Sequence, residues 1–422
     1  MVRQLVLFTH AFPYGTGEEF LEDELAELAV FFDRIRIVSR TGDRSSCREV
    51  PANAAPESAC PEHPQPLARK LRQTATALCR RPVWHELLTR APLSRPAALR
   101  RLLYYHTKAR DIAAWILANR PGFEAADTLF YTYWLGYETL AFRLVRQQGL
   151  PVAGVTRVHG QDLYPERHVP PYLPFHKPSL EASDGVFPIS EHGQRYLANR
   201  YGSDCVDTVH RLGVPDHGSG PAGEDPNTLV IVSCSYVVPV KRIRLLVEGI
   251  QAFADRRAHL KIHWHHIGGG PLLEAVVAYA ARRLPENVTP VWHGSIAHRR
   301  VFAFYRETPV DVFMNVSRSE GIPVSMMEAA SFGIPLIATA VGGVPEIVTS
   351  DNGILLEADP QAAGIAEALD AFHRLPRTEK LRLRQNSRTV WKNRYDARKN
   401  YRAFGRNLLS ILDERKCPSP NS

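Results

Sequence analysis

The stretch Asp311–Val348 restricts the fold more than any other part of the chain, because two short apolar runs enclose a polar loop and a helix. Residues 311–316 suit a buried parallel strand, and residues 335–339 repeat that pattern. Pro323 is tolerated in the first turn of a helix, and Gly333 ends that helix. A strand, a helix and a second strand in this order predict a parallel sheet with helices on its faces.

Two carboxylates lie on either side of the start of this helix, Glu320 in the loop and Glu328 inside the helix. About six helical residues at ~1.5 Å each separate them by roughly 9 Å. The helix N-terminus between them offers free backbone N–H groups, a site suited to a pyrophosphate. An isolated pair of glutamates is more simply a loop charge and a solvated helix face. The surrounding glycines, prolines and strands favour binding of a nucleotide-sugar, whose hydroxyls would reach both acids.

The order of Glu320, Glu328, Gly333-Ile-Pro335 and Gly342-Gly343-Val-Pro-Glu346 resembles the donor-site signature of the retaining family 4 glycosyltransferases, of the bacterial exopolysaccharide and lipid-linked glycan type. The resemblance covers most of the chain. It implies an α/β fold of GT-B type, with two doubly wound Rossmann-like domains facing each other across a cleft. It also implies that Glu320 contacts the donor sugar and Glu328 the ribose. The distal phosphate would be held by backbone amides near Gly321, Ile322, Pro323 and Val324.

In the resembled family an arginine and a lysine five residues apart clamp the donor phosphates. Lys241 stands at the lysine position, whereas Tyr236 occupies the arginine position. This departure removes one charge-assisted hydrogen bond, worth about 1.5–3 kcal/mol. Arg242 or Arg244 could replace it only if the helix directs their side chains to the phosphates.

His159 ends the predicted strand 152–159, at the edge of the sheet where α/β active sites are built. A lone histidine is more often a packed structural residue, but its Gly-x-Asp context favours a function. The resemblance implies that His159 holds a sugar hydroxyl or steadies charge at the anomeric carbon, without acting as a nucleophile. Asp162 would support the acceptor hydroxyl.

Two glycine-bearing loops are candidates for close approach of backbone to the donor. Gly15 and Gly17 lie between the first strand and a helix, but their spacing fits neither a dinucleotide fingerprint nor a P-loop. The resemblance implies that this loop faces the donor pyrophosphate and the acceptor. Gly269 lies in the turn after the strand 260–267, where backbone would approach the nucleotide.

Metal ligands are not evident in the sequence. On a strand His263 and His265 share one face while His266 points to the other, which disfavours a metal site. No Asp-x-Asp motif is present. We therefore expect no metal and no cofactor beyond the nucleoside-diphosphate sugar, which is the donor substrate.

The length of 422 residues suffices for two domains, and the strongest linker signal is a glycine- and proline-rich stretch after residue 214. We expect, in order, an N-terminal acceptor-binding domain (1–214) with a basic helical insertion (about 67–110), a linker (215–227), a C-terminal nucleotide-sugar-binding domain (228–390), a helix that crosses back to the first domain (391–415) and a disordered tail (416–422).

The segment 67–110 contains eleven Lys and Arg residues and one acid, Glu86, interleaved with leucines, Trp84 and tyrosines. This pattern is typical of an amphipathic surface on anionic lipid. A solvated basic face and a patch for a polyanionic acceptor remain alternatives, whereas no nucleic-acid-binding module accompanies the charge.

Six cysteines without regular spacing indicate free thiols, and neither a spanning segment nor a signal peptide is evident. We expect a cytoplasmic protein, either free or on the inner face of the cell membrane.

The resemblance implies a metal-independent retaining hexosyltransferase that moves a sugar to an acceptor hydroxyl in cell-surface polysaccharide or lipid-linked glycan synthesis. Three alternatives stay open: a nucleotide-sugar epimerase, a phosphorylase or disaccharide synthase, and a non-catalytic scaffold of a polysaccharide assembly complex. Tyr236 in place of the arginine favours the scaffold.

Overall fold

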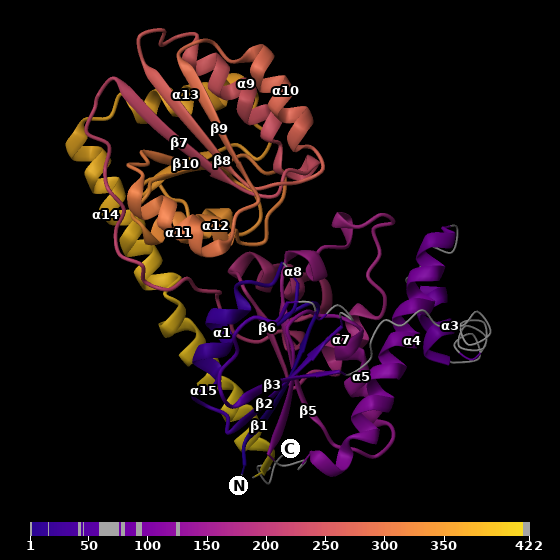
Figure 1. The fold of residues 1–422 in the computed structure, drawn as a ribbon. Helices are drawn as coiled ribbons and strands as arrows, with labels where there is room; N and C mark the ends of the chain where they lie inside the picture. Colours follow the sequence, from indigo (N-terminus) through magenta and orange to yellow (C-terminus); the bar gives the residue numbers. More distant parts are fainter. Residues whose placement is uncertain are drawn as a thin grey trace. The chain divides into compact units, whose positions relative to one another are not determined.

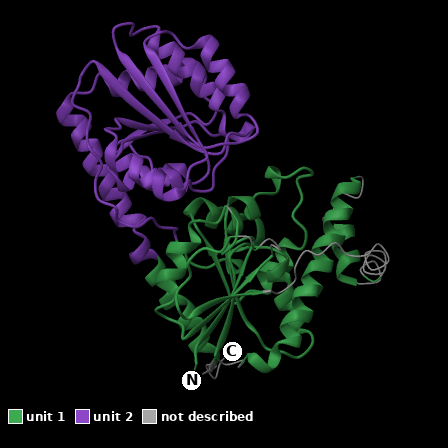
Figure 2. Cartoon of the chain, in the orientation of Figure 1, with its two compact units in different colours: residues 1–210, 401–422 green, residues 211–400 purple. Residues whose placement is uncertain are grey.

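The computed structural model describes residues 2–15, 17–40, 44, 46–58, 76, 81–89, 95–123 and 127–416. The chain forms two compact units (Figure 2): unit 1 comprises residues 1–210 and 401–422, and unit 2 comprises residues 211–400. Each unit contains a six-stranded sheet in which all neighbouring strands are parallel. Each unit is therefore Rossmann-like, as predicted.

The sheet of unit 1 has the strand order β3-β2-β1-β4-β5-β6, which is the order of dinucleotide-binding folds. Its strands are β1 (Gln4–Thr9), β2 (Arg34–Ser39), β3 (Ala54–Ser58), β4 (Thr128–Thr132), β5 (Ala153–Val158) and β6 (Gly185–Pro188). The helices described for this unit are α1 (Leu21–Leu28), α3 (Arg81–Thr89), α4 (Pro96–Ala118), α5 (Tyr137–Arg146), α6 (Gly160–Leu163), α7 (His176–Glu181), α8 (Glu191–Tyr201) and most of α15 (Ala397–Lys416).

Helices cover both faces of this sheet because strand residues alternate between them. Val6 and Phe8 pack with residues of α4 and α5, whereas Leu5 and Leu7 pack with α1 and α15. Figure 1 shows these two helix pairs on opposite sides of the sheet. The near-continuous apolar strands of the sequence thus form a sheet buried on both faces.

Of the predicted basic insertion, the structure describes residues 76, 81–89 and 95–110, and the rest lies outside the described residues. Residues 81–89 form α3, and residues 96–110 form the first two thirds of α4. Across the described ranges, every helix falls short of the length or the apolar character that crossing a bilayer demands.

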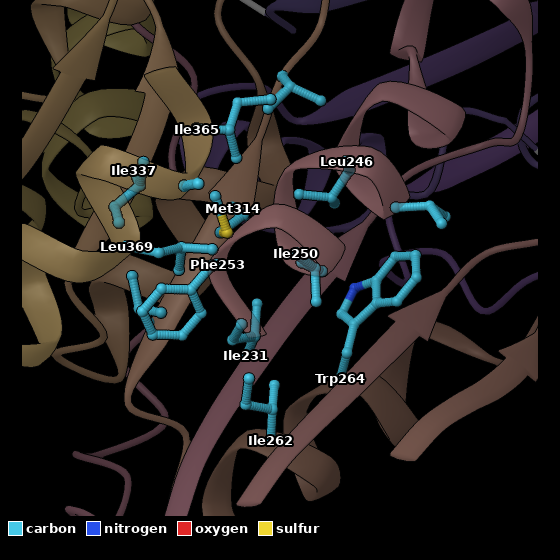
Figure 3. Packing of buried hydrophobic residues seen from close by; sticks show 14 of the residues in the cluster. Ile231, Leu246, Ile250, Phe253, Ile262, Trp264, Met314, Ile337, Ile365 and Leu369 are labelled. Atoms are coloured by element: carbon cyan, nitrogen blue, oxygen red, sulfur yellow. The ribbon is translucent and has the colours of Figure 1, made fainter. Parts of the chain in front are cut away.

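Unit 2 has the order β12-β11-β10-β7-β8-β9. Its strands are β7 (Thr228–Cys234), β8 (Lys261–Ile267), β9 (Val288–Gly294), β10 (Val312–Asn315), β11 (Leu336–Thr339) and β12 (Gly353–Leu356). Its helices are α9 (Ile243–Ala254), α10 (Leu273–Arg283), α11 (His298–Glu307), α12 (Val324–Ser331), α13 (Ala362–His373) and α14 (Arg377–Arg394), with short 3-10 turns η4 (Pro239–Lys241) and η5 (Val344–Glu346). Figure 3 shows its core, in which Ile250 of α9 and Leu369 of α13 pack over Ile231 of β7.

The prediction of a single helix over residues 391–415 is wrong. Helix α14 ends at Arg394, and α15 begins at Ala397. Asp396 Oδ1 accepts a hydrogen bond from the backbone N–H of Lys399 across 2.9 Å, the contact of a helix N-cap. The second helix therefore starts at its own cap, and residues 401–416 belong to unit 1.

The predicted linker 215–227 is packed onto unit 2 and belongs to it. Gly220 N–H donates to Phe332 O across 2.9 Å, and Arg384 of α14 donates to the carbonyls of Gly220 and Pro221. The glycines and prolines therefore belong to a segment that is packed on unit 2. The boundary between the two units lies before Arg211 instead. Of the tail predicted to be disordered, all but Lys416 lies outside the described residues.

Candidate active site

The strand order of unit 2 reverses between β7 and β10, because the chain adds β8 and β9 on one side of β7 and β10 to β12 on the other. Ligands of open α/β sheets bind at the carboxyl ends of the strands beside such a reversal. Lys241 follows β7 and Glu320 follows β10. The structure brings these two predicted residues together at this point.

Lys241 Nζ donates to Glu320 Oε1 across 2.5 Å, and Asn315 Nδ2 donates to the same oxygen across 3.2 Å. Burial alone would raise the pKa of Glu320. The charge of Lys241 and hydrogen bonds from Lys241, Ser317 and Asn315 outweigh burial and hold that pKa below the ordinary value of 4.5. Glu320 is therefore an ionised hydrogen-bond acceptor in a fixed position.

The loop of Glu320 rests on the glycine pair of the sequence signature. Gly343 N–H donates to Gly321 O across 2.6 Å. Gly342 has a φ of +55°, and a Cβ at that position would lie 1.9 Å from Glu320 O. Only glycine fits there, because any side chain would push the Glu320 loop away.

Helix α12 begins directly after this loop, with Pro323 as its N-cap. Val324 and Ser325 lie in the first turn, where backbone N–H groups have no acceptor within the helix. Both residues are partly exposed, whereas Ile322 and Pro323 are buried. The N–H groups at the start of α12 are therefore those of Val324 and Ser325, whereas Gly321, Ile322 and Pro323 precede the helix.

Glu328 is buried, and its Oε1 lies 2.6 Å from Nε2 of His298, the first residue of α11. The sequence reasoning missed His298, because thirty positions separate it from Glu328 and no motif marks it. Glu328, the predicted ribose-binding carboxylate, therefore already has a polar partner, and the side chain of that partner, His298, is partly exposed.

The glycine turn after β8 is packed against the loop that carries Tyr236. Gly269 O accepts a hydrogen bond from Val237 N–H across 2.7 Å, and Gly269 itself is buried. A Cβ on Gly268 would lie 2.0 Å from Ser235 O. Tyr236 itself is 60% exposed, so its side chain points into solvent at the position where the resembled family has arginine.

The two arginines that the sequence offered as substitutes, Arg242 and Arg244, do not replace the missing cation, because both are held elsewhere. Arg242 is buried, and its guanidinium donates to the carbonyls of Val316, Ser317 and Ala358 and pairs with Asp359. Arg244 is exposed on α9, where it lies over the ring of Tyr279 and pairs with Glu248. Arg242 instead fixes the end of β10 from which the Glu320 loop departs.

Replacement of Arg242 by methionine should lower the free energy of unfolding by about 3 kcal/mol, because buried carbonyls then lose charge-assisted partners. Urea denaturation followed by circular dichroism measures this change. Arg244→Met, in the first turn of α9, is the matched control and should leave the midpoint almost unchanged. Equal midpoints for the two variants would contradict this role of Arg242.

In unit 1, the loop after β1 is organised by an acid of its own. The Glu18 carboxylate accepts hydrogen bonds from the backbone N–H groups of His10, Ala11 and Phe12 and from Trp134 Nε1. Gly15 and Gly17 have φ of +63° and +104°, which favours glycine. Gly17 N–H donates to the Glu19 carboxylate across 3.0 Å. Four amides of this loop thus already face carboxylates.

His159 is buried at the end of β5, with its ring centroid 4.6 Å from that of Tyr133 and 4.4 Å from that of Trp134. Its Nδ1 lies 3.8 Å from Asp162 Oδ2, and among the described residues its Nε2 has no hydrogen-bond partner. Asp162 holds the adjacent turn, since its two oxygens accept from His159 N–H across 2.6 Å and Leu135 N–H across 2.8 Å. Asp162 thus orders the backbone around His159.

Two histidines of β8 lie close to other polar side chains. His266 Nδ1 lies 2.9 Å from Ser233 Oγ, and His265 Nδ1 lies 3.0 Å from His293 Nε2. Within the described part of the chain, no three His, Cys, Asp or Glu side chains converge in a way that could hold a metal ion.

Comparison with known proteins matches residues 226–374 to the family model for Glycosyl transferases group 1. The putative colanic acid biosynthesis glycosyltransferase WcaL of Escherichia coli is 24% identical over 263 residues, which cover 61% of this chain and 63% of WcaL. The O-antigen biosynthesis glycosyltransferase WbnH of Escherichia coli is 33% identical over 93 residues, 22% of this chain and 25% of WbnH. These alignments span less than two thirds of each relative's own length.

Among solved structures, the lipopolysaccharide outer core galactosyltransferase WaaB in its apo form matches with a TM-score of 0.67 and 14% identity over 96% of this chain and 99% of WaaB. HepE of Anabaena, in a complex with UDP-glucose, matches with a TM-score of 0.62 and 14% identity over 96% of this chain and 99% of HepE. At this identity the matches show the fold. The two Rossmann-like units and these matches show a fold of GT-B type, and within it residues 226–374 match the family of Glycosyl transferases group 1.

Proposed function

We propose that the chain is a retaining hexosyltransferase that moves a sugar from a nucleoside-diphosphate sugar to an acceptor hydroxyl in cell-surface polysaccharide or lipid-linked glycan synthesis. The observation that carries the proposal is the Lys241–Glu320 pair, which lies beside the start of α12 at the strand-order reversal of unit 2. The name of the WcaL relative supports glycosyl transfer, and the UDP-glucose bound to HepE supports a nucleotide-sugar as the donor.

In this proposal Lys241 supplies positive charge to the diphosphate as the bond to the sugar breaks. Its ammonium has three N–H donors, and one of them is directed to Glu320. The N–H groups of Val324 and Ser325 add the partial positive charge of a helix N-terminus. Charge that develops on the leaving diphosphate thus meets donors already in position, which is the main source of rate in such sites.

The remaining site residues take positioning roles. Glu320, which is ionised and buried, accepts hydrogen bonds from hydroxyls of the donor sugar, and Glu328 with His298 does so from the ribose. The Nε2 of His159 has no hydrogen-bond partner among the described residues, and we assign it to a sugar hydroxyl or to charge at the anomeric carbon. Asp162 acts on the acceptor side by holding the backbone next to His159.

Screening of nucleoside-diphosphate sugars tests the proposal. A sugar nucleotide that binds the folded protein should raise its melting temperature, and the same compound should then be consumed only when an acceptor is added. Turnover without any acceptor would indicate an epimerase instead. Absence of binding by every nucleotide would support the scaffold, which the exposed Tyr236 in place of arginine favours.

Metal independence gives a separate prediction. Because we assign the charge of the diphosphate to Lys241 and the helix N-terminus, turnover in EDTA should equal turnover in added Mg²⁺ or Mn²⁺. The assay compares initial rates after chelation and after re-addition of each metal. A loss of activity in EDTA that a metal restores would contradict this part of the proposal.

A membrane surface on unit 1 is the partner that we propose beside the donor and the glycan acceptor. On α3, Arg81, Trp84 and Leu88 follow one another at helical spacing, and Trp84 and Leu88 are 51% and 73% exposed. On α4, Arg100 and Tyr104 repeat the pattern, and Tyr104 is 45% exposed. Basic and apolar side chains exposed together suit the inner face of an anionic membrane.

The double variant Trp84→Ser with Leu88→Ser should weaken binding to vesicles that contain phosphatidylglycerol by about tenfold or more. Flotation of the protein with vesicles measures this, and vesicles of phosphatidylcholine alone should bind weakly. Leu355→Ser, which removes a 40% exposed leucine from β12 of unit 2, is the matched control. Equal flotation of all three proteins would exclude α3 as the contact.

A further inference from the structure

The chain passes between its two units twice, at residues 210–211 and 400–401. Within unit 2 the two segments next to these passages are bonded to each other. Val214 N–H donates to Tyr395 O across 2.8 Å, and Ala397 N–H donates to Val214 O across 3.2 Å. A Cβ on Gly213 would lie 2.3 Å from Ala397 Cα, so the two backbones touch. We name residues 211–214 and 394–400 the connecting segments.

Glu346, the last residue of the glycine signature, contacts both connecting segments. Its Oε2 accepts a hydrogen bond from Arg211 Nη2 across 3.2 Å. Its backbone carbonyl accepts from Arg394 Nη1 across 2.9 Å and from the Tyr395 hydroxyl across 3.2 Å. Glu346 is 8% exposed and Tyr395 is fully buried, so these contacts lie inside unit 2.

The same residue is joined to the Glu320 loop through the glycine pair. Glu346 N–H donates to Gly343 O across 3.0 Å, and Gly343 N–H donates to Gly321 O across 2.6 Å. Gly342 lies so close to Glu320 O that a methyl group could not be inserted. An unbroken series of hydrogen bonds and close contacts therefore leads from Arg211 through Glu346 to Glu320.

We propose that Glu346 is a positioning residue that holds the Glu320 loop in a fixed position relative to the connecting segments. A displacement of those segments would then change the position of Glu320. The proposal rests on the assigned role of Glu320 in turnover. A misplacement of about 1 Å in such a group can lower turnover by about 100-fold. The acid of the glycine signature thus acts on the reaction through its neighbours, without contact with the substrate.

Hydrogen exchange tests this coupling without any substrate. In Glu346→Gln and in Arg211→Met, the amide of Gly343 should exchange at least about fivefold faster, because its acceptor loop is no longer held. Peptides from β8 should exchange as in the wild type. Glu379→Gln, which removes the acid of an exposed ion pair on α14, is the matched control. Unchanged exchange at Gly343, or equally faster exchange in β8, would overturn the proposal.

Turnover separates positioning from a purely structural effect. Glu346→Gln should lower kcat by about 10- to 100-fold and leave KM for the nucleotide-sugar within about threefold. The charge exchange Arg211→Glu with Glu346→Arg should restore both the kcat and the protection of Gly343. Wild-type kcat in Glu346→Gln would refute the coupling. An inactive wild type would refute the proposed function alone, since hydrogen exchange still decides whether Glu346 holds the loop.

Discussion

Replacement of Glu320 by glutamine is expected to lower turnover by about 100- to 1,000-fold while the fold is retained. Glutamine keeps the size of the side chain and can still accept from Asn315, but it removes the charge that pairs with Lys241. A neutral amide accepts hydrogen bonds from sugar hydroxyls more weakly than a carboxylate does. Initial rates with the nucleotide-sugar identified by screening measure the effect, and circular dichroism verifies the fold.

The control for this variant is Glu307→Gln, which changes an exposed acid at the end of α11. It should keep wild-type turnover. Turnover of the Glu320 variant equal to that of this control would refute the role assigned to Glu320.

Acid titration gives an independent check on the same pair. Because the folded pKa of Glu320 lies below 4.5, its pairing with Lys241 stabilises the fold fully above that value. This contribution is lost as the pH falls through the lowered folded pKa. Glu320→Gln should lack this loss, so the difference in stability between wild type and variant should shrink in acid.

Gly342→Ala is expected to lower turnover by about 100-fold, although residue 342 is not assigned to substrate. The added Cβ would lie 1.9 Å from Glu320 O, and φ of +55° is unfavourable for alanine. The Glu320 loop must therefore move, and unfolding free energy should fall by about 1–3 kcal/mol. Kinetics and urea denaturation measure the two effects.

Gly364→Ala is the matched control, because a Cβ at this position in α13 would meet nothing within 4 Å. That substitution should raise stability by about 0.5–1 kcal/mol and leave turnover unchanged. If Gly342→Ala retained wild-type kcat, the glycine pair would have no part in placing Glu320.

Much of the site could be predicted from the sequence because local patterns determine it. The apolar runs around residues 311–339 require parallel strands, and parallel strands bring Lys241 and Glu320 to one edge of the sheet. Partners contributed by distant segments carry no such pattern. His298 meets Glu328 only because α11 and α12 are packed together. Two partners of Arg242, Ala358 and Asp359, lie in a loop more than 100 residues away.

The break between α14 and α15 was missed by the sequence prediction for a different reason. Asp396 is a good N-cap, and this local signal was present in the sequence. The apolar and basic periodicity of residues 391–412 continues across it and suggests one helix. The bridge between Val214 and Asp396 adds a contact that only the folded chain provides.

The carboxylate of Glu18 affects whether the loop after β1 can bind a phosphate. In unit 1 the backbone N–H groups after the first strand already donate hydrogen bonds to a carboxylate of the chain itself. A phosphate that entered there would have to expel Glu18 and would meet its negative charge. We therefore expect the Glu18 carboxylate to weaken binding of a diphosphate at this loop, so that two sheets of the same strand order need not compete for one nucleotide.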